Sequence, residues 1–370
     1  MSSESECVSI AFEQIRVAYA TGHYPISADF AVSPGEKFAI LGPSGGGKST
    51  LIKVAAGLIR GNGARKRRFA LNSSVYHSGK LIIGGQDLSD AEPSARAISL
   101  ISQHSNLYPH LTVRQNLELA KPPGVTKEHV FGLLEELGIG HLLDRRPSDI
   151  SGGEAQRVAL AKAMLRPSCC VAFDEPMSGL DQHLRIGLTT LIRQVHRRHP
   201  KTLLLVSHDQ ESTLGLADRV AFLHQGQILQ ISTPKDLVEN PAHVVVASAI
   251  DPFFRVRLDE IVPTASGFQV GPVSFKGPCL PTGVRSLVIN TRKVYRGNGG
   301  LQTPGWETEA NTERPSFVGG QAVFAVSLPC SDSDWNIPQM ANGECTSLLC
   351  LVVPQDGLFA FDGNGRRLKY

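Results

Sequence analysis

The sequence predicts an α/β domain with a mostly parallel sheet, followed by a small all-β, barrel-like domain. At 370 residues the chain is too long for one ordinary hydrophobic core and fits two domains. Up to about residue 238, strand-like and helix-like stretches alternate, and this order is typical of a parallel sheet. From about residue 251, short alternating apolar runs are separated by glycine and proline. We expect the domains at residues 1–240 and 241–370, joined near Asn240 and Pro241.

Apolar runs of strand length predict the buried strands of the first domain. They lie at residues 37–41, 169–173 and 203–206, and a further strand is expected at 80–83. Residues 50–59 predict a helix whose first turn overlaps Lys48 and Ser49. Residues 60–80 hold a basic run, namely Arg65, Lys66, Arg67 and Arg68. We interpret this run as a solvated insertion, with contact to anionic lipid, nucleic acid or a partner as the alternative.

The second domain is expected to consist of short strands. Alternating apolar residues predict them at 267–271, 285–289, 321–328, 347–353 and 358–361. Residues 296–316 contain several glycine, proline, asparagine and threonine residues, and this composition predicts a long loop.

Composition excludes several classes of protein. The chain has 41% hydrophobic and 19% charged residues and a net charge of only +3, so charge alone indicates no polyanionic partner. Its seven cysteines form no CxxC pair, which predicts neither a zinc site nor a disulfide framework and suits a reducing cytosol. The polar, acidic start is not a secretory signal, and no run of about 18 apolar residues predicts a membrane span.

Residues 42–50 read GPSGGGKST and fill the phosphate-binding loop pattern with Gly42, Gly47, Lys48 and Ser49. A predicted strand precedes this motif and a predicted helix follows it, as a phosphate-binding loop requires. This order argues against a glycine-rich turn that merely joins two elements. Such a loop lets backbone N–H groups surround phosphate oxygens at a helix N-terminus. We expect Lys48 to pair with the β- and γ-phosphates and Ser49 to ligate Mg²⁺.

Two carboxylates follow the predicted strand at 169–173. Asp174 can hold Mg²⁺ at the carboxyl edge of the sheet, and Glu175 can orient and deprotonate an attacking water. In isolation, the same pair could simply open an exposed loop.

Residues 150–157 read ISGGEAQR and allow two readings that can hold together. Ser151 and Glu154 form a capping box at the start of a helix. A helix start is also an anion site, and Gly152 and Gly153 would let the backbone approach a phosphate.

Over residues 8–238 the chain resembles the ATP-binding cassette (ABC) ATPases, a branch of the P-loop NTPases. GPSGGGKST resembles their Walker A loop, ISGGE their signature and CCVAFDEP their Walker B strand. SGLD, ending at Asp181, resembles the D-loop, Gln103 the Q-loop glutamine and His208 the switch histidine. Tyr19 stands where the family often stacks an aromatic ring on adenine.

The resemblance implies the roles of these residues and a helical subdomain at about 104–165. Glu175 would be the general base, His208 would orient the γ-phosphate and water, and Lys48 would hold the phosphates. Mg²⁺ would be ligated by Ser49, Gln103 and Asp174. Ser151 and Gly153 would contact the γ-phosphate bound to the opposite protomer, so a complete site needs two chains arranged head to tail. The implied nucleotide-contacting residues are Tyr19, Gly42, Pro43, Ser44, Gly45, Gly46, Gly47, Lys48, Ser49, Thr50, Gln103, Ser151, Gly152, Gly153 and Asp181.

Two regions resemble those of ABC importers. Residues 103–113 resemble the segment that meets the membrane subunits, and the C-terminal domain resembles the OB-like (TOBE) regulatory domain of importer ATPases. Its closing stretch, FAFDGNGRRL, is similar to the sugar-importer type. The resemblance therefore implies a peripheral ATPase at the cytoplasmic face of the inner membrane. Its partners would be a second copy, transmembrane permease subunits and, indirectly, a substrate-binding protein.

Alternatives to a sugar importer remain open. The solute could be an inorganic anion, iron or a polyamine. Outside transport, the chain could be a soluble ABC ATPase acting on nucleic acid, but it lacks the usual coiled coil or tandem ATPase domains, and we expect no nucleic-acid partner. A regulatory module with little turnover is disfavoured because both Glu175 and His208 are present. One departure from the family is Glu154, which replaces the usual signature glutamine.

Overall fold

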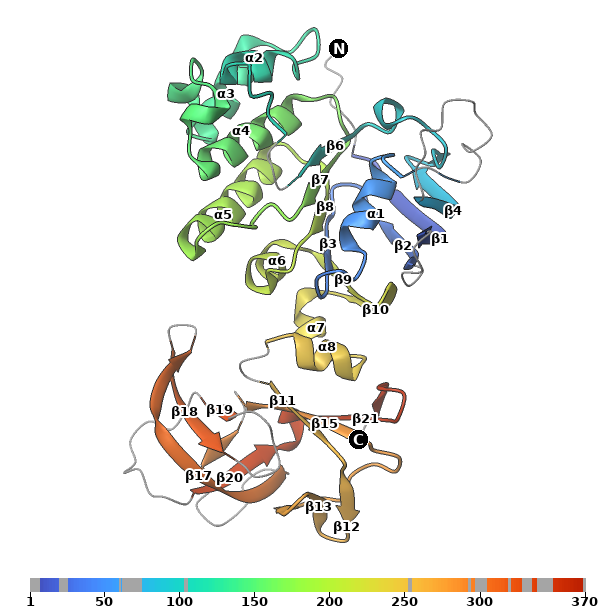
Figure 1. Cartoon of the computed structure of the whole chain (residues 1–370), viewed down its shortest axis with the longest axis vertical. Helices are drawn as coiled ribbons and strands as arrows, with labels where there is room; N and C mark the ends of the chain where they lie inside the picture. Colours follow the sequence, from blue (N-terminus) through green and yellow to red (C-terminus); the bar gives the residue numbers. More distant parts are fainter. Residues whose placement is uncertain are drawn as a thin grey trace. The chain divides into compact units, whose positions relative to one another are not determined.

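The computed structural model forms two compact units, Met1–Pro234 and Lys235–Tyr370 (Figure 1). It describes residues 7–19, 26–59, 61, 75–102, 106–251, 255–291, 294–296, 305–318, 321–327, 335–337 and 349–368. The basic run at Arg65, Lys66, Arg67 and Arg68 lies outside these described residues, and so does Gln103.

The first unit is built on a ten-stranded sheet with the order β5-β4-β1-β2-β10-β9-β3-β8-β7-β6. From β9 to β6 neighbouring strands are parallel, whereas β1, β2, β4 and β5 pair in antiparallel fashion. The parallel strands β3, β7 and β8 are almost wholly buried, as expected for continuous apolar runs between layers. The strand bounds are β1 Ile10–Tyr19, β2 Ile26–Val32, β3 Lys37–Leu41, β4 Val75–Ile83, β5 Gln86–Asp87, β6 Ile98–Ile101, β7 Cys170–Asp174, β8 Thr202–Val206, β9 Arg219–His224 and β10 Gln227–Ser232.

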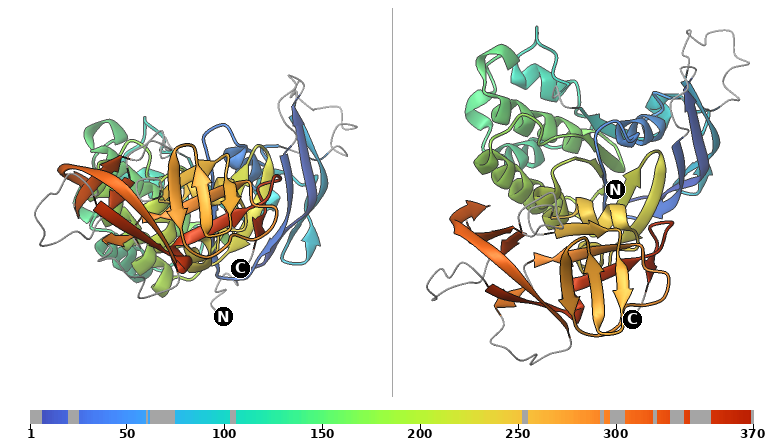
Figure 2. Two further views of the ribbon diagram at one scale, coloured as in Figure 1. Left: turned by 90° about the horizontal axis from the view of Figure 1, so that it is seen from below. Right: turned by 60° about the horizontal axis from the view of Figure 1, so that its bottom comes forward.

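The helices of the first unit divide into those beside the sheet and those at its β6 end. Helix α1 packs on β7 and β8, whereas α2, α3 and α4 gather at the end of the unit away from β1 and β4 (Figures 1 and 2). Among the described residues, no helix combines the length and the apolar character needed to cross a membrane. The bounds are α1 Lys48–Ala55, α2 Val113–Glu118, α3 Lys127–Glu136, α4 Gly152–Leu165, α5 Gln182–Arg198 and α6 Gln210–Leu216, with 3-10 turns η2 Pro93–Ala95, η3 Gly140–Leu142 and η4 Pro147–Asp149.

The predicted strands at 37–41, 80–83, 169–173 and 203–206 are present, with ends that differ by a few residues at most except at the start of β4. The predicted helix at 50–59 was too long at its C-terminal end. Helix α1 ends at Ala55 because Gly57 takes the left-handed conformation with φ of 78°, which terminates helices. Beside it, the fully buried Arg96 donates hydrogen bonds to the carbonyls of Val54 and Ala55, and it also binds Ser89 and Ala91.

The second unit begins with short helices, and two sheets follow. One sheet has the order β11-β15-β21-β22, and the other follows β12-β13-β14-β17-β18-β19, with β20 pairing β16 and β17. The all-β class expected for this part of the chain is confirmed. The bounds are α7 Pro234–Glu239, α8 Val244–Ala249, β11 Arg255–Asp259, β12 Val262–Thr264, β13 Gly267–Val270, β14 Val273–Lys276, β15 Ser286–Asn290, β16 Tyr295–Arg296, β17 Gly305–Val318, β18 Gln321–Ser327, β19 Trp335–Ile337, β20 Leu349–Pro354, η7 Gln355–Gly357, β21 Leu358–Phe361 and β22 Arg367–Leu368.

The predicted loop at 296–316 is wrong over most of its described length. Strand β17 covers Gly305–Val318 and pairs with β20 through Gly305 to Ala310 and with β18 through Asn311 to Val318. Trp306 and Thr308, two positions apart, are both buried, and this period places them on the core face of the strand. The core of this unit thus depends on a segment whose composition resembles that of a loop.

Candidate functional site

The phosphate-binding loop connects β3 to α1 and is held close to β9. A Cβ atom at Gly42 would lie 2.0 Å from the carbonyl oxygen of Leu223, and one at Gly47 would lie 2.5 Å from Cδ1 of Ile26. Both glycines also have positive φ, 149° and 101°. A side chain at either position would therefore strain the loop. The close turn brings backbone N–H groups to the N-terminus of α1, which is a favourable place for an anion.

Lys48 folds back over this loop. Its ammonium group donates hydrogen bonds to the carbonyl oxygens of Gly42 and Pro43, each at 2.9 Å, and its side chain is buried. Burial lowers the pKa of Lys48, whereas the neighbouring carboxylates of Glu175 and Asp174 act in the opposite direction. A buried cation in a loop of N–H groups has the chemistry to bind phosphate oxygens.

Ser49 and Asp174 lie side by side at the carboxyl edge of the sheet. The Ser49 hydroxyl, in the first turn of α1, donates a hydrogen bond to Oδ1 of Asp174, at the end of β7, over 2.6 Å. A hydroxyl and a carboxylate are hard oxygen donors, and this donor set fits Mg²⁺. The third ligand implied by the resemblance, Gln103, is outside the described residues.

Glu175 and His208 form a pair across neighbouring strand ends. Nδ1 of His208, after β8, lies 3.3 Å from Oε2 of Glu175, after β7. Glu175 has a φ of 54°, rare for a residue other than glycine, and its N–H donates to the carbonyl of Val206. Strained residues of this kind persist where the surrounding structure holds them, often at functional sites. The structure thus places Lys48, Ser49, Asp174, Glu175 and His208 along one edge of the sheet.

The ISGGE segment is the start of α4, and its capping box is confirmed. Ser151 is the N-cap; its hydroxyl and its N–H both donate to Oε2 of Glu154 at 2.8 Å, and the Ser151 oxygen accepts from the Glu154 N–H at 3.3 Å. These hydrogen bonds, first from the backbone and then from the hydroxyl, lower the pKa of Glu154. His141 Nε2 lies 3.7 Å from the other carboxylate oxygen.

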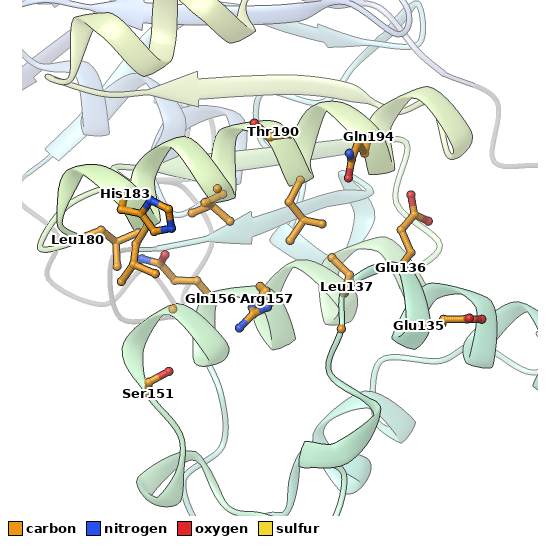
Figure 3. Close-up of a pocket in the computed structure, with 16 residues that line it drawn as sticks. Glu135, Glu136, Leu137, Ser151, Gln156, Arg157, Leu180, His183, Thr190 and Gln194 are labelled. Carbon is orange, nitrogen blue, oxygen red and sulfur yellow. The ribbon is translucent and has the colours of Figure 1, made fainter.

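A groove of about 490 Å³ runs between α5 and the helices α3 and α4 (Figure 3). Figure 3 shows Ser151, Leu180 and His183 at one end of the groove and Glu136 and Gln194 at the other. The hydrogen bonds described for Ser151 run to Glu154 and not to the phosphate loop. Ser151 and Gly153 line this groove, and Lys48 is not among the residues that line it.

Other predicted residues have local structural roles. The Asp181 carboxylate caps α5 by accepting from the N–H of Leu184 at 2.9 Å. Thr50 is buried in the first turn of α1. Of Tyr19, the structure describes only the backbone, which pairs with Val75 at the end of β1. Pro43, Ser44, Gly45 and Gly46 complete the loop before α1.

The segment from Asn106 to Thr112 is fixed by polar contacts. The fully buried Asn116 binds the backbone of Tyr108, Leu111 and Thr112. Lys162 of α4 lies over the ring of Tyr108, 4.1 Å from its centroid, and donates to the carbonyl of Asn106. This turn presents the exposed Tyr108 on a rigid support.

Sequence reasoning missed two residues of the site region. Arg185 of α5 contacts both the carbonyl of Leu180 and the carboxylate of Asp209, the neighbour of His208. The signal available in the sequence was that Arg185 lies one helical turn after Asp181 and that Asp209 directly follows His208. Only the fold brings the two segments together.

The fold and the loop define a nucleotide-binding domain of the phosphate-loop class. Residues 27–178 match the family described as ABC transporter. The chain is 38% identical over 369 residues to sn-glycerol-3-phosphate import ATP-binding protein UgpC 3 of Agrobacterium fabrum, covering 97% of this chain and 99% of that protein. It is 32% identical over 376 residues to UgpC of Rhodopseudomonas palustris, covering 97% and 98%.

The chain belongs to the ATP-binding protein family of ABC transporters and is an ATP hydrolase. A crystal structure of an ATP-binding cassette of an ABC transporter, in its ADP conformation, has the same fold. It superposes with a TM-score of 0.50 at 22% identity and covers 64% of this chain and 96% of that one.

Proposed function

We propose that this chain is the ATPase subunit of an ABC importer and acts as a homodimer that binds Mg-ATP between its two copies. The observation that carries this proposal is the edge of the sheet where Lys48, Ser49, Asp174, Glu175 and His208 meet. It holds a buried cation, an oxygen-donor pair and an acid beside an imidazole, which are the groups that phosphoryl transfer to water needs.

Within one copy, each group would have one task. Lys48 would exchange the carbonyls of Gly42 and Pro43 for phosphate oxygens, and the N–H groups of residues 44–50 would complete the cradle. Ser49 and Asp174, with Gln103, would hold Mg²⁺, which supplies charge neutralisation on the β- and γ-phosphates. Glu175 would accept a proton from the attacking water, and His208 would orient that water and the γ-phosphate.

The second copy would complete the site with Ser151, Gly152, Gly153 and Asp181. Gly152 and Gly153 support this assignment, because their own packing does not require glycine. A Cβ at Gly152 would meet nothing within 4 Å, and one at Gly153 would meet only Leu184 at an ordinary 3.7 Å. Bare backbone at an exposed helix N-terminus favours close approach of an anion.

The partners and the solute follow from the relatives. Because those relatives are named as import ATP-binding proteins, we propose transmembrane permease subunits, an indirectly coupled substrate-binding protein and a peripheral position at the cytoplasmic membrane face. The rigid turn around Tyr108 offers a surface for the permease. For the solute we propose sn-glycerol-3-phosphate, which the names of the relatives specify and which agrees with a sugar-type importer.

The first experiment replaces the proposed base. Glu175→Gln should keep ATP binding, lower kcat by about 10²- to 10⁴-fold and trap an ATP-dependent dimer. Glu211→Gln, an exposed acid of α6, is the matched control and should hydrolyse ATP like the wild type. Normal turnover by Glu175→Gln would exclude Glu175 as the base.

The second experiment identifies the partners and the solute. Glu175→Gln protein recovered from detergent-solubilised membranes should carry permease subunits with it. Proteoliposomes containing those subunits, the substrate-binding protein and the wild-type chain should take up labelled sn-glycerol-3-phosphate when ATP is supplied. Recovery without any membrane protein would overturn the transporter proposal, and uptake of maltose, sulfate or spermidine instead would overturn the proposed solute.

A further inference from the structure

Arg185 connects two loops that border the proposed catalytic pair. Its Nε donates a hydrogen bond to the carbonyl of Leu180, just before Asp181, at 2.7 Å. Its Nη1 lies 4.0 Å from Oδ2 of Asp209, the residue after His208. One side chain in the first turn of α5 therefore contacts the segment before that helix and the segment that carries His208.

The contact with Asp209 is an ion pair that falls short of a hydrogen bond. The Asp209 side chain is 13% exposed, and its Oδ2 atom is buried without a hydrogen-bond partner among the described residues. The backbone of Asp209 is well fixed, because its N–H donates to the hydroxyl of Ser207 and its carbonyl accepts from Thr213. A buried carboxylate oxygen without a hydrogen bond is costly, and within the described part of the chain the guanidinium of Arg185 forms an ion pair with it.

We propose that Arg185 is a positioning residue that makes the orientation of His208 depend on the position of the Leu180–Asp181 segment. When that segment moves toward β8, the guanidinium closes the gap to Asp209 and forms the missing hydrogen bond. Because Asp209 follows His208 directly, the same movement determines how the imidazole is oriented toward Glu175. In the present structure, Nδ1 of His208 lies 3.3 Å from Oε2 of Glu175. Arg185 would act through His208 and would not touch the nucleotide.

This inference rests on the proposed function, in which Asp181 faces the second copy. Docking of the second copy against the Leu180–Asp181 segment would then change the orientation of His208 in the same chain, through Arg185 and Asp209. Hydrolysis would be favoured only after the two copies have met. The rigid fork of arginine suits this task, since Nε can hold the Leu180 carbonyl while a terminal nitrogen reaches Asp209, whereas a lysine offers a single point charge.

Another arginine of α5 provides a control that separates a purely structural role of Arg185 from the proposed one. Arg193 of α5 also reaches α6, where it donates to the carbonyl of Gly215. Among the described residues, no hydrogen bond or ion pair joins Arg193 to the Leu180–Asp181 segment or to Asp209. Arg193→Gln therefore removes an arginine bridge between the same helices and leaves the proposed connection intact.

The test compares steady-state ATP hydrolysis and melting temperature across a double-mutant cycle. Arg185→Gln and Asp209→Asn should each lower kcat about tenfold and leave KM for ATP within about twofold, a coupling of the usual size for residues in contact. The double variant should be no slower than the slower single variant. Arg185→Lys should stay as slow as Arg185→Gln, while Arg193→Gln should keep the wild-type kcat.

Several outcomes would overturn the inference. It fails if Arg185→Gln keeps the wild-type kcat, if the two single effects multiply in the double variant, or if lysine restores full activity. If Arg185→Gln does not fold, Asp209→Asn is compared with Glu211→Gln, which neutralises an exposed acid of the neighbouring helix α6, and only Asp209→Asn should lower kcat. All these ratios need only basal ATP hydrolysis, so they can fail while Glu175→Gln and the transport assay still support the proposed function.

Discussion

Replacing Glu154 by glutamine should separate the stability of α4 from the affinity of its N-terminus for an anion. Oε2 of Glu154 accepts hydrogen bonds from the N–H and the hydroxyl of Ser151, both at 2.8 Å, and the other oxygen faces His141. Glutamine has nearly the same shape and can still complete the capping box. The substitution therefore removes a negative charge and little else.

The expected loss of stability is small. A hydrogen bond to a charged group contributes about 1 kcal/mol more than a neutral one, and an acidic side chain in the first turn of a helix gains about 0.3–1 kcal/mol from the helix dipole. Since the site is solvent-accessible, screening reduces both contributions, and we expect a net loss of about 0.5–1 kcal/mol. For a unit of this size that corresponds to a fall in Tm of roughly 1–4 °C.

The effect on the proposed dimer should have the opposite sign. If the N-terminus of α4 faces a triphosphate, a carboxylate about 6 Å from a phosphate charge costs roughly 1–3 kcal/mol at an intermediate effective dielectric. Each site should consequently tighten the ATP-dependent dimer by roughly 5- to 100-fold, and the proposed dimer holds two such sites.

Analytical ultracentrifugation in the Glu175→Gln background measures this tightening, with melting curves recorded on the same samples. His141→Ala is the matched control, because it removes the imidazole beside Glu154 and keeps the carboxylate, so it should not tighten the dimer. A Glu154→Gln dimer as weak as the parent, at unchanged ionic strength, would show that the α4 N-terminus does not face the nucleotide.

Three further substitutions test the first unit. Lys48→Ala should weaken ATP binding by at least about 100-fold in calorimetry, because the loop loses its buried cation, and Tm should fall little. Arg96→Met should destabilise the protein by about 3 kcal/mol or more in denaturant unfolding, since the carbonyls at the end of α1 lose a buried donor; a loss under 1 kcal/mol would refute this. Burial lowers the pKa of Lys201 to about 8. Because the unfolded chain binds that proton more tightly, wild-type stability relative to Lys201→Met should rise from pH 8 to about 10.5 and stay level below pH 8.

The parts of the fold that depend on short-range sequence were predictable. The phosphate loop and β7 have signals within about ten residues, because glycine geometry and continuous apolar runs determine them locally. The neighbouring positions of Lys48, Ser49 and Asp174 followed from the rule that the carboxyl ends of parallel strands share one edge. Their roles toward ATP and Mg²⁺ remain predictions.

What the sequence could not predict depends on distant partners. The end of α1 is set partly by Arg96, which is 41 residues beyond Ala55 in the chain. The segment that forms β17 has a composition that favours a loop. It is a strand because it pairs with β18 and β20, which lie later in the chain. Arg185 and Asp209 become neighbours only when α5 and α6 pack together.

Helix α1 is fastened at both ends, by Lys48 on the carbonyls of Gly42 and Pro43 and by Arg96 on those of Val54 and Ala55. These hydrogen bonds suppress fraying, the local unwinding of the ends by which a short helix usually responds to a displacement. A displacement of the phosphate loop must carry the whole helix as a rigid rod against β7 and β8. In the nucleotide-free protein, deuterium should therefore enter the amides of α1 more slowly than those of the similarly short α6.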